Sequence, residues 1–193
     1  EDLAISHFGR KALPVILKAV KCEFGCNEDT FYMLGILFEQ MKEYREEAAK
    51  MLIELAEDKS EKEYVRRGAI VVISYLEEPA LIVENNLVKI KADEPKFSES
   101  VDEALIGMKS KYAGKIYAEI LDYSFDVATF VDISKLGVNG YDAGPAVTQL
   151  LNEDDIEIQV AAARALGYIE YTPAVPKLIQ LLNARTSVQL NWS

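Results

Sequence analysis

The chain has 193 residues, of which 50% are hydrophobic, and a net charge of −11 from 32 acidic and 21 basic residues. This composition supplies a sizeable core, and only 10 glycines and 6 prolines favour helix over strand. The acidity argues against nucleic-acid binding and favours a basic protein partner, although solubility alone also explains it. No apolar run approaches the ~20 residues that span a bilayer, so we expect no membrane segment.

Reactive and metal-binding residue types are scarce. The chain has one histidine, His7, and two cysteines, Cys22 and Cys26. Two cysteines are too few for a disulfide framework, so we expect ordinary thiols between helices and a reducing, cytoplasmic location. The alternative for the two thiols is a local redox pair. A single histidine supports neither a catalytic triad nor a four-ligand zinc site with the two thiols. We therefore expect no enzyme activity, no metal and no cofactor.

Apolar residues recur at helical spacing and predict a series of short helices. The polar segment 91–100, KADEPKFSES, contains a proline and predicts an irregular connection. The predicted helices are 10–20, 28–41 paired with 43–57, 62–76 with 79–92, 100–111 with 113–123, 126–137 with 142–152, and 155–168 with 173–183.

The last pair has the clearest boundaries. Asp154 followed three residues later by Glu157 predicts a capped helix start, and Gly167 is a plausible end signal. Thr172 before a proline predicts the start of the second helix. A buried stripe is expected on that second helix, formed by Val175, Leu178, Ile179 and Leu182.

The same letters return at a nearly constant spacing. PAVTQLLN at 145–152 and PKLIQLLN at 176–183 lie 31 residues apart, and Tyr141 precedes Tyr171 by 30. SVQLNWS at 187–193 overlays EIQVAAA, again 30 apart, and 63–91 overlays the same unit. This spacing predicts an array of helix–turn–helix repeats.

One helix pair cannot bury its own apolar stripe, so neighbouring pairs must stack. Small residues, Ala161 to Ala163 and Ala165, are expected to allow first helices to approach closely. The paired leucines at 150–151 and 181–182 are expected to form the core between layers. The stacking face at the end of the chain is expected to be covered by a continuation of the array or by a partner.

At DIEIQVAAARALGYIEYTPAVPKLIQLL the sequence resembles HEAT-like repeats, in particular the short kind named after phycobilisome lyases. The resemblance is strong over 155–193 and good over 63–91 and 126–152. It implies an all-α, right-handed α-solenoid of about five to six antiparallel helix pairs. Residues 1–193 would form one domain, a segment of a longer array. The Arg after the first apolar residue of such repeats occurs once, at Arg66.

A rival interpretation concerns the N-terminal part. The stretch 31–55 places Phe31, Leu34, Gly35 and Phe38 near the offsets of a tetratricopeptide unit, with no second copy following. That family also stacks helix pairs into a right-handed solenoid, so the predicted fold class is the same.

The resemblance implies a non-catalytic protein-binding or scaffold module that uses the concave face, because solenoids offer an extended inner surface. Polar positions on the second helices would contact the partner, or they could simply be ordinary solvated helix surface. These positions are Gln149, Asn152, Lys177, Gln180 and Asn183. The repeat's namesake implies an alternative, a bilin-lyase-like subunit, and the acidity suggests another, an inhibitor of a basic protein such as a nuclease or toxin.

Two enzyme activities found among HEAT-like proteins are not expected for this chain. Some HEAT-like proteins are di-iron hydroxylases that use several His-Glu pairs, and no such pair occurs in this chain. Another branch excises alkylated bases from DNA, which requires a basic groove for phosphates. Lys and Arg are scattered along this acidic sequence, so we expect no nucleic-acid partner.

Overall fold

A computed structural model describes residues 9–23 and 28–190. The ordered elements in those ranges are all helical, with eleven α-helices, several short 3₁₀ segments and no strand. The predicted all-α class is therefore confirmed for the described chain. The α-helices are α1 Leu13–Val20, α2 Glu28–Gln40, α3 Arg45–Glu57, α4 Glu63–Ser74, α5 Glu84–Asp93, α6 Ser98–Gly107, α7 Ala113–Leu121, α8 Val127–Lys135, α9 Gly144–Gln149, α10 Ile156–Tyr168 and α11 Val175–Leu190.

Contacts between residues divide the chain into two compact units, Glu1–Ser110 and Lys111–Ser193. The boundary falls between α6 and α7, within the predicted pair formed by 100–111 and 113–123. The pairing of these two helices therefore stays a prediction. The same holds for one continuous solenoid over residues 1–193. Each unit is described separately below.

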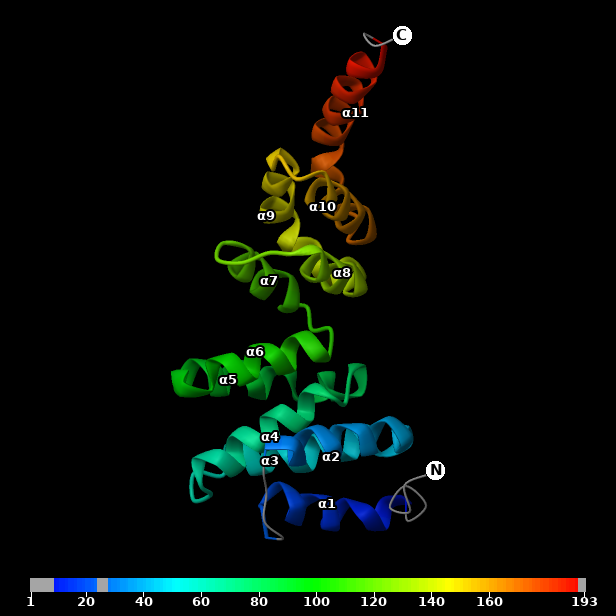
Figure 1. Cartoon of the computed structure of the whole chain (residues 1–193). Helices are drawn as coiled ribbons and strands as arrows, with labels where there is room; N and C mark the ends of the chain where they lie inside the picture. The colour runs from blue at the N-terminus through cyan, green and yellow to red at the C-terminus, as the bar shows by residue number, and fades with distance from the viewer. Residues whose placement is uncertain (1–8, 24–27, 191–193) are drawn as a thin grey trace. The chain divides into compact units, whose positions relative to one another are not determined.

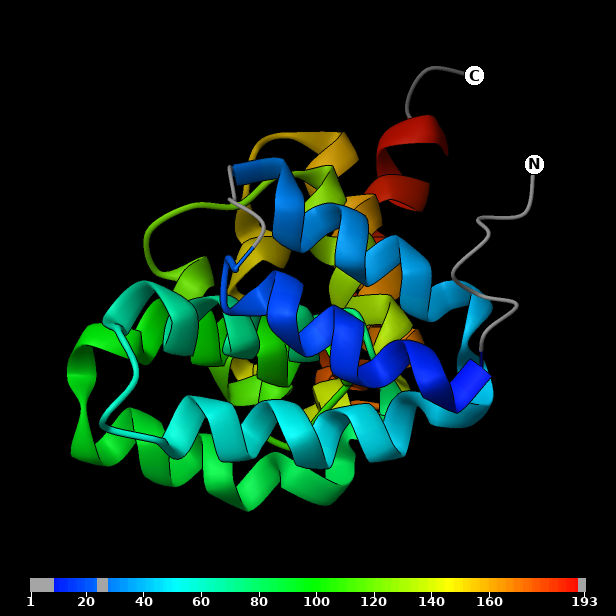
Figure 2. The ribbon, with the colours of Figure 1, turned by 90° about the horizontal axis from the view of Figure 1, so that it is seen from below.

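The first unit has two successions of packed helices. Helices α2, α4 and α6 follow one another as packed neighbours, and α1 packs beside α2 and α3 (Figures 1 and 2). Helix α3 also contacts α5 and the 3₁₀ segment η3, Glu78–Val83. Fully buried side chains fill the space between these helices, among them Phe38, Leu52, Ile70, Ile73 and Phe97. Helix pairs therefore stack on their neighbours, as the repeat pattern predicts.

Two buried arginines join successive elements of this unit. Arg45 Nε donates to the Phe38 carbonyl at 2.8 Å, and its Nη1 lies 2.5 Å from a carboxylate oxygen of Glu77. Arg66 repeats the arrangement, with Nε donating to the Ala56 carbonyl at 2.7 Å. Both side chains are only 4% exposed, so their paired carboxylates compensate charges that would otherwise be costly to bury.

Arg66 makes the more complete of the two sets of contacts. Its two terminal nitrogens donate to the two carboxylate oxygens of Glu94 at 2.9 and 2.6 Å. The side-chain hydrogen bonds from Arg66 hold the pKa of Glu94 below its ordinary value of 4.5. Glu94 in turn raises the pKa of Arg66, so each residue stabilises the charged form of the other. Sequence alone identified Arg66 but not its partner.

The segment 91–100 is more regular than its polar sequence predicts. Helix α5 continues to Asp93, Pro95–Phe97 form a 3₁₀ turn, and α6 begins at Ser98. Phe97 explains the difference, because its fully buried ring lies 4.8 Å from the Arg66 guanidinium and 5.3 Å from that of Arg67. An irregular connection is therefore wrong for most of this segment.

The second unit also has two layers. Helices α8 and α10 pack together on one side, and α7 and α9 pack together on the other (Figure 1). Helix α10 additionally contacts α9 and the short 3₁₀ segment η6, Leu150–Asn152. Two of the four small residues expected at a close approach, Ala162 and Ala165, are fully buried, whereas Ala161 and Ala163 are only half-buried. Helix α11 follows η7, Thr172–Ala174, directly in the chain, and none of its described side chains up to Ala184 is buried.

Helix ends in this unit differ from prediction by a few residues. Asp155, not Asp154, is the N-cap of α10 and accepts hydrogen bonds from the Glu157 and Ile158 amides. Glu157 completes no capping box there. Gly167 lies inside α10, and the left-handed residue that follows the helix is Glu170, with φ of 56°. Thr172 lies in η7, and α11 starts at Val175.

The predicted buried stripe of the last helix is wrong for three of its four residues. Val175, Ile179 and Leu182 are exposed, and Leu178 is half-buried. Leu182 is 66% exposed, whereas its repeat equivalent Leu151 is fully buried. The reason is that η6 packs under α10, while no described helix follows α11 to cover its corresponding face.

Candidate binding surfaces

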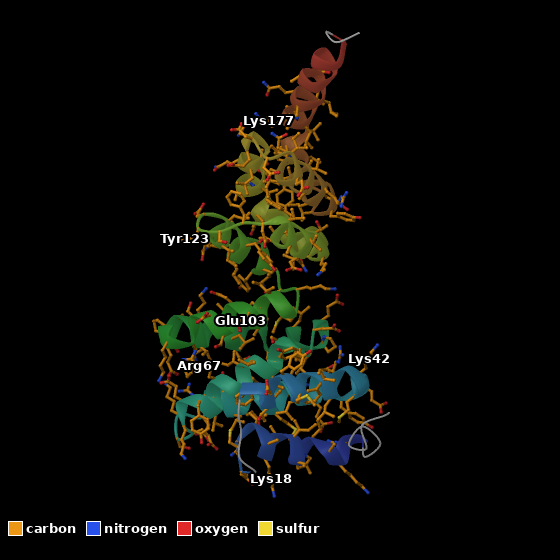
Figure 3. The ribbon with its side chains drawn as sticks, in the orientation of Figure 1. Lys18, Lys42, Arg67, Glu103, Tyr123 and Lys177 are labelled. Atoms are coloured by element: carbon orange, nitrogen blue, oxygen red, sulfur yellow. The ribbon has the colours of Figure 1, made fainter. Side chains whose placement is uncertain are left out.

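The five predicted partner-binding residues lie in the second unit. Gln149 ends α9, Asn152 ends η6, and Lys177, Gln180 and Asn183 lie on α11. All are exposed except Lys177, which is half-buried near the start of α11 (Figure 3). The side-chain amide of Asn152 donates to the Gln149 carbonyl at 2.9 Å, which satisfies a carbonyl at the end of α9.

Local sequence explains why Gln149 and Asn152 face solvent. Pro145 occupies the first turn of α9, where its missing N–H costs no helical hydrogen bond. Val147, Leu150 and Leu151 then turn to the buried side, which leaves Gln149 and Asn152 on the exposed side. The structure thus joins Gln149 with Asn152 directly and places Gln180 and Asn183 on the next second helix.

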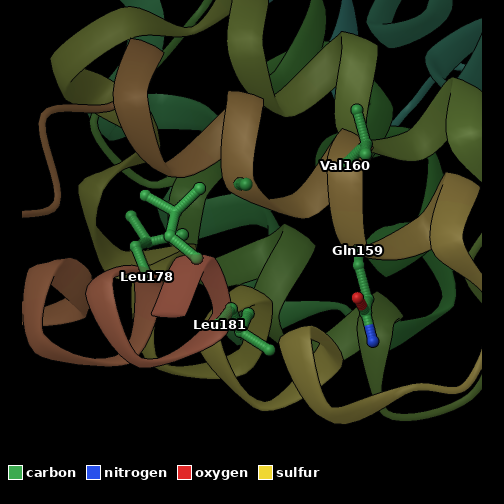
Figure 4. A pocket seen from close by; sticks show the side chains of 6 residues that line it. Gln159, Val160, Leu178 and Leu181 are labelled. Atoms are coloured by element: carbon green, nitrogen blue, oxygen red, sulfur yellow. The ribbon is translucent and has the colours of Figure 1, made fainter. Parts of the chain in front are cut away.

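A second surface is apolar and lies between α10 and α11. A groove of about 300 Å³ is lined by Gln159 and Val160 of α10 and by leucines of α11, as Figure 4 shows. We call this the α10–α11 groove, and its lining residues are Gln159, Val160, Ala163, Leu178, Leu181 and Leu182. The sequence predicted an apolar stacking face at the end of the chain that needs a cover, but it placed these leucines in the core and did not identify the groove.

A smaller group of exposed apolar side chains borders the other side of α10. Val127 of α8 and Ile156, Val160 and Ala161 of α10 line a second depression together with Glu157 and Arg164. Val160 belongs to both depressions. Helix α10 therefore exposes apolar surface on two sides, while its residues Ala162 and Ala165 remain buried.

The tyrosines divide into buried and exposed groups. Tyr117 is buried in α7, and burial, with a smaller contribution from Asp132, raises its pKa to about 12. Tyr123 is 91% exposed in the turn after α7 (Figure 3). Tyr141 and Tyr171 contact each other edge to face with ring centroids 5.0 Å apart. The tyrosines of this unit therefore range from the core to the open surface.

The cysteine prediction needs correction. Cys22 is disulfide-bonded, so the expectation that it is an ordinary thiol is wrong. The only other cysteine, Cys26, and the single histidine, His7, lie outside the described residues. Residue types alone could not reveal the bond, because a disulfide requires the two sulfur atoms to come together in space. The cytoplasmic location, which rested on free thiols, stays a prediction.

Metal and membrane sites were also sought in the described part of the chain. No three His, Cys, Asp or Glu side chains there are placed to hold a metal ion. No helix in the same ranges is long and apolar enough to cross a membrane.

The fold places this chain among all-helical proteins whose helix pairs pack on their neighbours in the manner of a repeat array. Within it, residues 158–184 match the PBS lyase HEAT-like repeat. This segment covers α10, η7 and the first part of α11, the region where the sequence resemblance is strongest. The match does not bear on the tetratricopeptide-like stretch 31–55, which stays a hypothesis. No curated protein matched the chain.

Proposed function

We propose that this chain is a non-catalytic protein-binding module that holds a protein segment along its second helices, on the concave face of a HEAT-like solenoid. One observation supports the proposal most directly. Exposed Gln and Asn side chains recur on successive second helices, at Gln149 and Asn152 and again 31 residues later at Gln180 and Asn183. An extended segment that crosses such units would meet the same polar groups at each step.

The side-chain chemistry suits a polypeptide ligand. An amide offers two N–H donors and one carbonyl acceptor, the same groups that a peptide backbone needs to complete its hydrogen bonds. The net charge of −11 favours a basic segment, because long-range attraction accelerates encounter between opposite charges. Lys177 is itself a cation, so it should repel positively charged side chains of the partner at its own position.

Site-specific photo-crosslinking tests the placement. A photoreactive amino acid at position 149 or 180 should give adducts with a bound polypeptide, whereas the same group at Glu157 or Arg164 on α10 should give few. The two control positions are exposed in the same unit. The triple variant Gln149→Ala/Gln180→Ala/Asn183→Ala should capture less of the partner identified in this way. Equal adducts at all four positions, or undiminished capture, would contradict the placement.

Salt dependence tests the predicted charge of the partner. Binding driven by opposite charges weakens as ionic strength rises, because screening shortens the range of attraction to about 10 Å at 0.1 M salt. An affinity that is unchanged between low and high salt would argue against a basic partner. It would also argue against the alternative role as an inhibitor of a basic nuclease or toxin.

A bilin-lyase-like subunit is a second candidate, favoured only by the name of the matched repeat. Co-expression of the chain with a bilin and a bilin-binding acceptor protein tests it. A coloured covalent adduct that depends on the chain would support this candidate, and a colourless acceptor would count against it.

A further inference from the structure

The exposed face of α10 carries aliphatic side chains where a first helix of the first unit carries charges. Ile156 and Val160, the first and fifth residues after the N-cap of α10, are 60% and 47% exposed. The same places on α4 hold Glu63 and Arg67, which form an ion pair at 3.3 Å. The second unit therefore has two aliphatic side chains where the first has a partly exposed ion pair, and aliphatic side chains are stabilised by removal from water.

A following repeat does not close this kind of face. Val127 and Val131 are the first and fifth residues after the N-cap of α8, the places that Ile156 and Val160 occupy on α10. The next first helix, α10, already packs beside α8, and Val127 and Val131 are nevertheless 42% and 46% exposed. The exposure of aliphatic side chains at these places therefore does not depend on whether another repeat follows.

Between α8 and α10 this face forms a depression of about 280 Å³ that has one charge of each sign beside its aliphatic lining. We call it the α8–α10 depression, and its lining residues are Val127, Ile156, Glu157, Val160, Ala161 and Arg164. Glu157 and Arg164 are seven residues apart on one helix, which places them on the same side and about 10 Å apart along the axis. Both are exposed, and neither side chain forms an ion pair within residues 9–23 and 28–190.

We infer that the α8–α10 depression joins two copies of the chain in an antiparallel contact of α10 with α10. A two-fold axis near Ala161 places Arg164 of each copy beside Glu157 of the other, so one surface supplies both halves of two ion pairs. The aliphatic side chains of the two copies then cover each other, and Ala161 is small enough for the two helices to cross closely. A different partner would need the same opposed charges beside a matching aliphatic strip, whereas a second copy has them by symmetry.

The inferred contact is independent of the proposed function. It uses first helices, whereas the proposed partner lies on polar side chains of second helices, so either can fail without the other. The two also give different products in the photo-crosslinking experiment. A crosslink from position 157 or 164 that joins two copies has twice the mass of the chain, and only an adduct of these positions with another polypeptide counts against the proposed placement.

An exchange of charges between two variants tests the contact on the full 193-residue chain. Sedimentation equilibrium of the unsubstituted chain should show a dimer whose fraction rises with concentration. Glu157→Arg alone, or Arg164→Glu alone, should weaken dimerisation roughly tenfold or more, because like charges then face each other twice. An equimolar mixture of the two variants should restore association, because every arginine in the mixed dimer again faces a glutamate.

Variants of apolar residues locate the contact. Val127→Lys, in the α8–α10 depression, should weaken dimerisation roughly tenfold or more. Val138→Lys is the matched control, since Val138 is exposed in the same unit but outside the depression. Leu182→Lys, in the α10–α11 groove, should leave dimerisation unchanged. Thermal unfolding of all the variants checks that the fold is intact.

Three results would overturn the inference. The first is a chain that stays monomeric up to about 1 mM, a concentration at which even a weakly bound pair associates. The second is a dimer that Val127→Lys leaves intact or that Leu182→Lys dissociates, which would place the contact on another surface. The third is a mixture of folded Glu157→Arg and Arg164→Glu chains that associates no better than either variant alone, which would show that the two charges do not face each other.

Discussion

Tyr141 and Tyr171 occupy equivalent positions in successive repeats, and their rings meet edge to face at an interplanar angle of 62°. The repeat therefore brings one residue type into contact with its own copy 30 positions later. The Tyr171 ring also lies directly over Gly144, where a Cβ atom would come within 2.2 Å of it. Glycine at 144 makes room for the tyrosine of the next repeat.

The tyrosine contact should be measurable as a coupling energy. We expect a double-mutant cycle of Tyr141→Leu and Tyr171→Leu to give about 0.5–1 kcal/mol, at the lower end for aromatic pairs because Tyr141 is partly exposed. Urea unfolding of the four proteins supplies the values. Tyr171→Leu removes the contact with Gly144 whether residue 141 is tyrosine or leucine, so that contact does not contribute to the coupling energy. Strict additivity would show that the two rings do not interact.

Two glycines should respond in opposite directions to alanine. A Cβ at Gly107 would lie 2.3 Å from the Ser74 carbonyl oxygen, where backbone blocks any adjustment, so Gly107→Ala should destabilise by about 1–3 kcal/mol. Gly167 lies inside α10 with nothing within 4 Å of an added Cβ. Gly167→Ala should therefore stabilise the fold by about 0.5–1 kcal/mol. Thermal unfolding compares them, and equal effects would contradict the close approach of α4 and α6.

Leu151 and Leu182 share their sequence context but not their burial. Leu151→Ala should cost about 2–5 kcal/mol, because it empties space under α10, whereas Leu182→Ala should cost less than about 1 kcal/mol. Chemical denaturation of the two single variants measures the difference. Similar costs would mean that the face around Leu182 is covered in the isolated chain.

Acid should selectively weaken the first unit through Glu94. Its pKa is lowered in the folded state, so its pair with Arg66 contributes fully above the unfolded-state value near 4.5. That contribution is lost as pH falls through the lower folded-state pKa. Glu94→Gln should therefore lower stability at pH 7 and flatten the decline of stability below about pH 4.5. Denaturant unfolding at several pH values measures this.

Glu99→Gln is the matched control for the acid experiment, because Glu99 is an exposed carboxylate of α6 a few residues along the chain. Its stability profile should run parallel to that of the unsubstituted protein. If Glu94→Gln also gave a parallel profile, the pair with Arg66 would not control the acid response.

Sequence predicted the helices well because their signals are local. Pro145 and Pro173 mark helix starts, and the apolar spacing marks the faces, so most boundaries fall within a few residues. Burial could not be predicted in the same way, since Leu151 and Leu182 stand in identical QLLN letters. Whether a leucine is covered depends on a neighbouring element, which the repeat itself does not encode.

The candidate surfaces show the same division. Gln149, Asn152, Gln180 and Asn183 were predicted to be exposed from their position beside an apolar stripe, and they are exposed. An apolar stacking face in need of a cover was predicted at the end of the chain, but the residues of the α10–α11 groove were not, because apolar letters alone predict a core. The partners of Arg45 and Arg66 were also missed, since Glu77 and Glu94 lie 32 and 28 residues away.

The arginine contacts bear on how the two units open to solvent. Each buried arginine holds a carbonyl of an earlier helix and a carboxylate beyond a later one, so α3, α4 and α5 cannot detach singly. Their amide hydrogens should exchange together and slowly, whereas those of α11, whose described side chains are exposed or half-buried, should exchange early. Local opening of the first unit should therefore release these three helices together rather than one at a time.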